Sequence, residues 1–495
     1  MARVRLIVVS NRGPVAFERS EGGQIATRRS GGGLATALRG LAAEHDVTWI
    51  ASAITEADRE LAELLGGQTR EVEVARDATA RLSLIAHDPR AYDRFYHTVA
   101  NPLLWFVHHQ LGAPTGAPTS GRALSTVWDQ GYAAVNERFA DAVVAELGAA
   151  PDALVVFHDY HLYLAPALVR RRVPEAALAH VVHVPWLPAE AWSGLPAAVR
   201  REIHEGVLAN DLVVFQTERW RVNFLRCCAV FTAARVDESA GSVRLAGRQA
   251  LARARAVSVD PAELAALAAS PPVETEAAAL RGSRPEKLIL RVDRADPAKN
   301  IVRGFAAYAL LLARHPELLG RVGMLALLHP SRQAVLDYAE YEAAIRSHAE
   351  ALNARFARGS WQPLRLRIED NVAAALAAYR EYDVLLANSV YDGMNLVVKE
   401  GPLLNERSGV VVLSENAGAF EELAAHVVGI NPFDVSEQAD ALLRALCMDA
   451  EERLRRGTAI CRHTKRYNAS AWGRWHVREL RAAPAGRGRR IQGGV

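Results

Sequence analysis

Short, unbroken apolar runs alternate with longer helix-like stretches along most of this chain, and this alternation constrains the fold more than any other feature. The apolar runs occupy residues 6–10, 153–157, 179–184 and 211–217, and then residues 287–292, 321–328, 364–368, 383–389 and 409–415. Because their hydrophobicity is continuous and does not alternate, each run fits a strand that helices bury on both faces. The sequence therefore predicts an α/β protein with parallel sheets.

The apolar runs form two series, separated by a stretch rich in proline, glutamate and alanine at residues 270–286. Since 495 residues are too many for one core, we expect two doubly wound, Rossmann-like domains that face each other across a deep cleft. We place these domains at residues 1–256 and 257–480. Residues 481–495 hold four arginines and no acid, and we interpret them as a disordered basic tail.

Charge and cysteine usage narrow the classes of partner and compartment. The chain has 59 Lys and Arg against 56 Asp and Glu, so its net charge of +3 predicts no nucleic-acid or membrane partner for the protein as a whole. Its 4 cysteines show no CxxC spacing, and the first residues run straight into a strand without a signal peptide. These features favour a cytoplasmic protein, and they leave open whether it forms a homo-oligomer.

Polar residues follow several predicted strands directly, where an α/β sheet binds its ligands. Arg294 and Lys299 lie beyond the strand at residues 287–292, and together they could neutralise a diphosphate. Surface ion pairs with the neighbouring Asp293 and Asp296 explain the two cations equally well. The polar segment at residues 158–162, HDYHL, follows another apolar run and fits a cleft.

Residues 383–407 predict a strand, a polar turn and then a helix. Asp392 lies in the turn and could bind sugar hydroxyls, whereas Glu400 lies about two helical turns further on and could bind a ribose. At the predicted helix start, the N–H groups of Gly393, Met394, Asn395 and Leu396 would face a phosphate. An ordinary strand, cap and helix is the alternative interpretation.

A metal site was considered because His158 and His161, and likewise His180 and His183, are three residues apart. Both pairs would have to converge, yet a strand at residues 179–184 would point His180 and His183 to opposite faces. We therefore predict no metal site. A separate run of glycines at residues 31–33 precedes a helix and could approach a phosphate.

Eight motifs in this order resemble the trehalose-6-phosphate synthase family of retaining glycosyltransferases. They are VVSNRGP, SGGGL, HDYHL, HVPW, QTERW, RVDRADPAKN, HPSR and DGMNLVVKEG. The resemblance covers nearly all of residues 4–470 and implies the GT-B fold of two Rossmann-like domains. It also implies transfer of glucose from a nucleoside-diphosphate-glucose to glucose 6-phosphate, giving α,α-trehalose 6-phosphate. The nucleotide sugar is then a co-substrate, and no further cofactor is expected.

The resemblance assigns roles to individual residues. For the phosphate of the acceptor sugar it implies Arg12, Tyr96, Trp105 and Arg332. For the donor it implies Gly33, His183, Arg294, Lys299, Asp392 and Glu400, to which the predicted helix start adds the backbone of Gly393, Met394, Asn395 and Leu396. As catalytic residues we predict Asp159, which would touch acceptor hydroxyls, together with His183, Arg294 and Lys299.

Several positions depart from the best-known members of this family. Tyr391 stands where those members carry Arg, and Asn388 and Ser389 replace a Thr-Pro pair. LNER at residues 404–407 and Trp192 near HVPW are similar to an actinobacterial branch that includes validoxylamine 7′-phosphate synthase. Alternatives are therefore a glucosylglycerol-phosphate synthase, a pseudo-glycosyltransferase that uses a cyclitol, or a non-catalytic sugar-phosphate sensor. The base of the nucleotide is not predicted.

Overall fold

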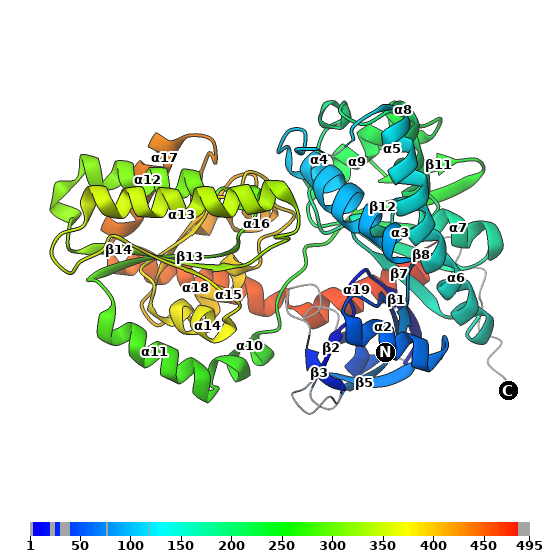
Figure 1. Cartoon of the computed structure of the whole chain (residues 1–495), viewed down its shortest axis with the longest axis horizontal. Coiled ribbons are helices and arrows are strands. Elements are labelled where there is room, and N and C mark those ends of the chain that lie inside the picture. Colours follow the sequence, from blue (N-terminus) through cyan, green and yellow to red (C-terminus); the bar gives the residue numbers. More distant parts are fainter. Residues whose placement is uncertain (1–2, 20–24, 30–39, 76–77, 117, 484–495) are drawn as a thin grey trace. The chain divides into compact units, whose positions relative to one another are not determined.

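The chain folds into two α/β units, which the computed structural model describes over residues 3–19, 25–29, 40–75, 78–116 and 118–483. Unit 1 consists of Met1–His108, Gly112–Val257 and Ala469–Val495, and unit 2 consists of His109–Leu111 and Ser258–Asn468. In Figure 1 the blue to green elements as far as β12, together with the red α19, build unit 1, and the elements from the green α10 to the orange α18 build unit 2.

Unit 1 is built on a sheet with the order β10-β11-β12-β9-β8-β7-β1-β4-β6-β5. Its strands are β1 Arg5–Val9, β4 Asp46–Ser52, β5 Arg70–Ala75, β6 Ala78–Ile85, β7 Leu154–His158, β8 Ala177–Val181, β9 Leu212–Phe215, β10 Arg235–Asp237, β11 Ser242–Leu245 and β12 Arg248–Ala254, with a separate hairpin of β2 Val15–Arg19 and β3 Ile25–Arg29. The run from β12 to β6 is parallel, and antiparallel strands extend it at both ends.

The helical segments of unit 1 lie between these strands. They are α2 Glu56–Leu65, α3 Pro89–Asp93, η1 Arg94–Leu104, α4 Trp105–His109, α5 Gly121–Val127, η2 Trp128–Ala133, α6 Ala134–Ala149, η3 Tyr160–Leu162, α7 Ala165–Arg172, η4 Ala189–Trp192, α8 Ala197–Leu208, α9 Glu218–Phe231 and α19 Ala469–Ala482. Both η1 and η2 are π-helices, which often occur near functional sites. Every residue of β7 and β8 is buried, as the continuous apolar runs predict.

Unit 2 has a fully parallel sheet in the order β15-β14-β13-β16-β17-β18. Its strands are β13 Lys287–Arg294, β14 Val322–His329, β15 Leu364–Ile368, β16 Val384–Ala387, β17 Val410–Ser414 and β18 Val428–Ile430. Its helical segments are α10 Pro261–Ala268, α11 Pro271–Ser283, η5 Pro297–Lys299, α12 Ile301–Arg314, η6 Pro316–Leu318, α13 Leu336–Phe356, α14 Val372–Glu381, α15 Val397–Leu404, α16 Gly418–Leu423, η7 Ala424–His426, α17 Val435–Cys447 and α18 Ala450–Arg466. Helices α12 and α13 cover one face of this sheet, and α14, α15 and α18 cover the other (Figure 1).

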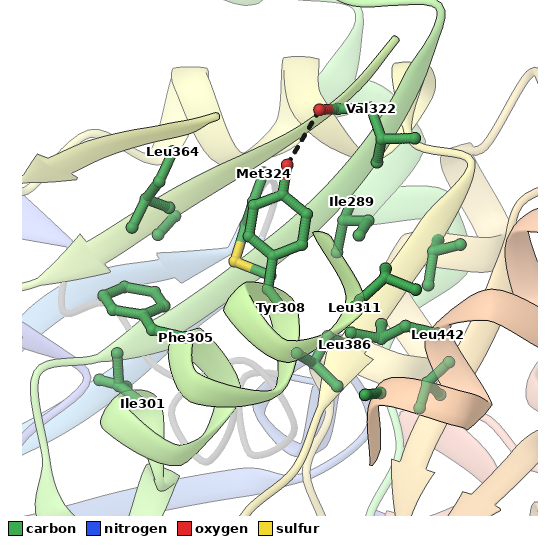
Figure 2. Packing of buried hydrophobic residues seen from close by; sticks show 14 of the residues in the cluster. Ile289, Ile301, Phe305, Tyr308, Leu311, Val322, Met324, Leu364, Leu386 and Leu442 are labelled. Atoms are coloured by element: carbon green, nitrogen blue, oxygen red, sulfur yellow. Dashed lines mark hydrogen bonds between the residues drawn. The ribbon is translucent and has the colours of Figure 1, made fainter. Parts of the chain in front are cut away.

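The core of unit 2 lies between the sheet and helices α12, α13 and α17. Figure 2 shows Phe305, Tyr308 and Leu311 of α12 directed at the apolar side chains of the strands, with Leu442 of α17 beside them. The hydroxyl group of the fully buried Tyr308 donates to the carbonyl oxygen of Val322 at 2.9 Å, so this polar atom is satisfied inside the apolar core. Such a rigid core holds the strand ends, and hence the loops that follow them, in fixed positions.

All strands predicted from the apolar runs are present, which confirms the α/β prediction for both halves of the chain. The six strands of the sheet in unit 2 have the order 3-2-1-4-5-6 when they are numbered along the chain. The parallel strands β6-β4-β1-β7-β8-β9 of unit 1 have the same order. The order reverses between β1 and β7 in unit 1, and between β13 and β16 in unit 2. Ligands of doubly wound sheets bind beyond the carboxyl ends of the strands at such a reversal.

The last helix, α19, belongs to a different unit from the one that the predicted domain division gives it. Residues 469–480 were assigned to the second domain, but their contacts group them with unit 1, where α19 packs against β7 and β8. Trp472, Val477 and Leu480, which form the apolar face of α19, are buried. The helix continues through Ala482, and residues 484–495 of the predicted tail lie outside the described residues.

Within the part of the chain that the structure describes, no helix combines the length and the apolar character that crossing a membrane requires.

Candidate active site

The strand reversal of unit 2 brings two oppositely charged side chains into contact. Lys299 follows β13 and Asp392 follows β16, and the Nζ of Lys299 lies 2.6 Å from the Oδ2 of Asp392. Burial disfavours the charge on both groups, but their mutual attraction outweighs it, so the pKa of Lys299 is raised and that of Asp392 is lowered. The pair is therefore ionised at neutral pH, at the place where a doubly wound sheet binds its ligand.

Arg294 and Arg332 both approach one buried carboxylate, that of Asp296. The Nη2 of Arg294 and the Nη1 of Arg332 each lie 3.4 Å from its Oδ2. Burial raises the pKa of Asp296, but the two arginines outweigh it and hold the pKa below its ordinary value. The ion pair of Arg294 with Asp296 that the sequence indicates is thus present, but its carboxylate is buried and also holds Arg332.

The predicted helix start after Asp392 is wrong by several residues. Residues 393–396 form a loop, and α15 begins at Val397. The loop is held by a bond from the backbone N–H of Ala419 to the carbonyl of Met394 at 2.9 Å, and Asn395 has a left-handed φ of 71°. Its side-chain amide donates to Asp392 at 3.2 Å, so the loop fixes the carboxylate without being the first turn of a helix.

Glu400 lies in the first turn of α15 and has one neighbour that sequence reasoning missed. The hydroxyl group of Tyr379, on α14, donates to the Oε2 of Glu400 at 3.1 Å. Burial raises the pKa of Glu400, and the bond from Tyr379 opposes that rise. The bond holds the carboxylate in a single direction, which a group that binds a ribose needs.

Helix α15 is anchored by a buried ion pair behind Glu400. The Nζ of Lys399 lies 2.6 Å from the Oε2 of Glu422 on α16, and His463 of α18 lies 3.3 Å from the other carboxylate oxygen. Burial raises the pKa of Glu422, but His463 and Lys399 outweigh it and bring the pKa to about 2. The pair therefore fixes the helix that carries Glu400.

The depressed pKa of Glu422 predicts a loss of stability in acid. Its folded-state pKa lies below its unfolded-state value, so the stabilisation is complete above about pH 4.5 and disappears as the pH falls towards 2. A shift of this size corresponds to about 3 kcal/mol. Urea unfolding at pH 5, 4 and 3 should show a steeper decline for the wild type than for Glu422→Gln. Glu421→Gln, an exposed neighbour on α16, controls for the removal of a carboxylate, and parallel declines in the wild type and Glu422→Gln would contradict the assignment.

Arg291, a fully buried arginine, supports the strand reversal of unit 2. The sequence did not indicate this role. The Nε of Arg291 donates to Asp293 at 2.8 Å, and its Nη2 donates to Asn388 at 2.7 Å and to the carbonyl of Lys299 at 2.5 Å. These bonds join β13, the loop that carries Lys299 and the end of β16. Asn388, noted from the sequence as a departure from the family, is therefore part of this network.

In unit 1, Asp159 lies directly beyond β7 in a strained backbone conformation. Its φ of 68° is uncommon for a residue other than glycine. Its N–H donates to the carbonyl of Val181 at 2.8 Å, and the N–H of His183 donates to its Oδ1 at 3.1 Å. Such strain, fixed by the neighbouring strand end, is typical of a functional position.

The ring of His183 is held by two side chains of unit 1. The Nε2 of Gln216 lies 3.3 Å from its Nδ1, and the Nδ1 of His158 lies 3.2 Å from its Nε2. The amide nitrogen of Gln216 can only donate, so Nδ1 of His183 accepts and Nε2 carries the hydrogen. Burial lowers the pKa of His183 to about 3, which makes the ring neutral. A sugar hydroxyl that contacts this ring must replace one of the two bonds.

Arg12 follows β1 on the other side of the strand reversal in unit 1. Its Nη2 donates to the hydroxyl of Tyr96 at 3.1 Å, and the ring of Tyr96 stacks on that of Tyr92 with centroids 5.7 Å apart. Tyr96 lies on the π-helix η1, and Trp105 begins α4 directly after it. The structure thus brings Arg12 and Tyr96 together and buries most of Trp105, which is 7% exposed.

The described residues do not bring three His, Cys, Asp or Glu side chains together in a group that could hold a metal ion. His158 and His183 do meet. The strand predicted at residues 179–184 ends at Val181, so His183 lies beyond it. Gly33 lies outside the described residues. Of the predicted site residues that are described, Arg12, Tyr96, Trp105, Asp159 and His183 belong to unit 1, and the others belong to unit 2.

Residues 4–482 match the family model described as glycosyltransferase family 20. A bifunctional trehalose-6-phosphate synthase/phosphatase from Thermoproteus tenax is 33% identical, and the alignment covers 98% of this chain but 64% of that relative. The UDP-forming alpha,alpha-trehalose-phosphate synthase 2 of Aspergillus fumigatus is 30% identical over 96% of this chain and 97% of its own length. A validamine 7-phosphate valienyltransferase from Streptomyces hygroscopicus subsp. jinggangensis is also 30% identical, over 92% of this chain and 90% of its own length.

Solved structures resemble the chain over nearly its whole length. A UDP-forming alpha,alpha-trehalose-phosphate synthase from Burkholderia xenovorans in complex with glucose-6-phosphate superposes with a TM-score of 0.81 and 27% identity, covering 96% of this chain and 100% of its own. A structure from E. coli bound with UDP-2-fluoro glucose also gives a TM-score of 0.81, at 26% identity, covering 96% of this chain and 98% of its own. These likenesses confirm the predicted GT-B fold class.

Proposed function

The chain belongs to glycosyltransferase family 20, and on that premise we propose that it transfers glucose from UDP-glucose to glucose 6-phosphate with retention at the anomeric carbon. The products are α,α-trehalose 6-phosphate and UDP. Support comes from a relative named as UDP-forming and from a similar structure that holds glucose-6-phosphate. The chain spans 64% of the length of the bifunctional relative, and the synthase reaction is the one that we propose.

The observation that carries the proposal is the ionised Lys299–Asp392 pair at the strand reversal of unit 2, with 2.6 Å between the charged atoms. We assign Arg294 and Lys299 to the donor diphosphate, Asp392 to the glucose hydroxyls and Glu400 to the ribose. Gly33 and the backbone of residues 393–396 complete the donor contacts. Two permanent cations matched to a diphosphate need no metal ion to neutralise it.

The chemical step is driven by charge that develops on the leaving group. As the bond from the anomeric carbon to the β-phosphate oxygen breaks, the phosphate gains negative charge, and Arg294 and Lys299 stabilise it. The acceptor hydroxyl attacks the same face of the sugar, so the configuration is retained. Its proton passes to the departing phosphate oxygen, and UDP leaves with it. Asp159 orients the acceptor hydroxyls, while the neutral His183 donates to the donor sugar.

We assign Arg12, Tyr96, Trp105 and Arg332 to the phosphate of the acceptor. Arg12 and Tyr96 already share a hydrogen bond of 3.1 Å, so a guanidinium and a hydroxyl donor lie side by side. Planar guanidinium groups suit a dianionic phosphate, because each presents two parallel N–H donors.

A second candidate is the transfer of a cyclitol to a phosphorylated amino-cyclitol. The valienyltransferase matches this chain at the same 30% identity as the fungal synthase, and it also spans most of the chain. Tyr391, which precedes Asp392, is a position where a change of side chain would alter ring recognition. In this second function the phosphate and diphosphate contacts stay the same, and the rings of both the donor and the acceptor differ.

A product assay distinguishes these functions. Purified protein is incubated with glucose 6-phosphate and UDP-, GDP- or ADP-glucose, and in parallel with a phosphorylated amino-cyclitol and a nucleoside-diphosphate cyclitol. The products are identified by mass spectrometry and by NMR of the anomeric protons. We expect a phosphorylated non-reducing disaccharide whose single glycosidic bond joins two α-configured anomeric carbons, formed fastest from UDP-glucose. Product only from a cyclitol donor would replace the first candidate by the second. Tight binding of UDP-glucose and glucose 6-phosphate without turnover of either class of donor would contradict both.

A further inference from the structure

Asp296 lies between two arginines that the proposed function assigns to different substrates. Its side chain is fully buried, and a single oxygen, Oδ2, is 3.4 Å from the Nη2 of Arg294 and 3.4 Å from the Nη1 of Arg332. Arg294 is assigned to the donor diphosphate and Arg332 to the acceptor phosphate. One carboxylate oxygen therefore restrains both guanidinium groups.

The carboxylate is itself fixed on its other side. The backbone N–H of Ala298 donates to the Oδ1 of Asp296 at 3.0 Å, so the side chain caps η5, the short helix that ends at Lys299. The hydroxyl of Tyr338, on α13, lies 3.5 Å from Oδ2. Because Oδ1 accepts a hydrogen bond from the backbone, the direction of Oδ2 is fixed. Oδ2 can therefore hold the flexible side chains of Arg294 and Arg332 in place.

Arg332 is held by contacts beyond the one with Asp296. Its backbone has a left-handed φ of 44°, its side chain is 8% exposed, and its guanidinium contacts both the hydroxyl and the ring of Tyr338. The side chain of Arg294 is more exposed, at 43%, and it also contacts Asp296. Two arginines and one carboxylate leave a net positive charge, which still attracts phosphate groups.

We propose that Asp296 is a positioning residue that sets the guanidinium groups of Arg294 and Arg332 together, and so prepares the donor and acceptor sites as one unit. The proposal rests on the proposed function, because it needs Arg294 and Arg332 to bind the two substrates. Asp296 itself touches neither substrate. It holds each guanidinium group in its binding orientation before the ligand arrives. The side chains then lose less conformational entropy on binding.

The test begins with Asp296→Asn, which keeps the shape of the side chain and removes its charge. We expect the KM for UDP-glucose and the KM for glucose 6-phosphate each to rise by about tenfold, the effect of weakening one charge-assisted contact at each site. Asp383→Asn is the matched control. Asp383 is a buried carboxylate of the same unit, 2.6 Å from Arg284 and 3.3 Å from Arg453, and it lies at the amino end of β16, away from the strand reversal. That variant should leave both KM values unchanged, and thermal unfolding of both variants reports any general loss of structure.

Double variants separate positioning from a general structural role. If Asp296 acts on the donor through Arg294, then Asp296→Asn should no longer raise the donor KM when Arg294 is already alanine. In the same way, it should no longer raise the acceptor KM in the Arg332→Ala background. Additive effects in both backgrounds, or a rise in only one KM of the single variant, would overturn the proposal. Absence of any effect of Arg294→Ala and Arg332→Ala themselves would instead contradict the proposed function.

Discussion

Replacement of Lys299 by alanine should lower kcat by roughly 100- to 1000-fold, the loss expected when one donor that stabilises developing charge is removed. Lys299 is the cation nearest to Asp392, at 2.6 Å, and it lies at the strand reversal where the diphosphate is proposed to bind. The KM for UDP-glucose should also rise, because the cation contacts the diphosphate before the bond breaks. The KM for glucose 6-phosphate should change much less, since no acceptor contact is assigned to Lys299.

Steady-state kinetics with each substrate varied in turn measure these effects, and thermal unfolding shows whether the variant is folded. Lys287→Ala is the matched control, because Lys287 begins the same strand and lies 3.9 Å from the carboxylate of Asp383. It carries the same charge at the amino end of β13, so its loss should leave kcat unchanged. A Lys299→Ala enzyme with normal kcat, or equal losses in the two variants, would remove Lys299 from the donor site.

The sequence predicted the framework of this fold because the framework depends on local patterns. Strands buried on both faces must be continuously apolar, and each predicted run became a strand. The return of α19 to unit 1 could not be predicted, because an amphipathic helix reveals that it has an apolar face but not which surface covers that face. The helix start at Val397 was misplaced for a similar reason: the left-handed Asn395 and the bond from Ala419 to Met394 are set by tertiary contacts.

Of the candidate site, the sequence could predict only those residues that come directly after the end of a strand. Arg12, Asp159, Lys299 and Asp392 each lie just beyond a strand at a reversal of the strand order, as their positions in the sequence indicate. Supporting residues gave no such signal. Arg291 lies inside an apolar run, and one of its partners, Asn388, is 97 residues away along the chain. No periodicity or motif in a single sequence connects two such positions.

Replacement of Arg291 by methionine should destabilise unit 2 by about 3–5 kcal/mol, the cost typical of removing one partner from a buried ion pair. Asp293 would remain buried with Lys299 at 4.0 Å as its nearest cation, and Asn388 and the carbonyl of Lys299 would each lose a donor. Urea unfolding measures the loss. Arg321→Met is the matched control, because Arg321 pairs with Glu286 at 2.7 Å on the surface of the same unit, where both side chains are more than half exposed. That variant should unfold like the wild type, and similar losses in the two variants would contradict a special role for Arg291.

Gly304, on α12, provides an independent test of where the Arg291 guanidinium lies. A Cβ atom at this position would lie 2.4 Å from the Nη1 of Arg291 and 3.2 Å from the Nδ2 of Asn388, so the glycine is needed to make room for the buried arginine. Gly304→Ala should therefore destabilise the wild type by about 1–3 kcal/mol, as overpacking of a core does, although alanine is the better helix former. In the Arg291→Met background the clash is relieved, and the same substitution should cost much less or become stabilising. If Gly304→Ala lowers the free energy of unfolding equally in both backgrounds, the guanidinium of Arg291 lies elsewhere. If the loss depends strongly on the background, Arg291 and α12 are packed against each other beneath the loop that carries Lys299.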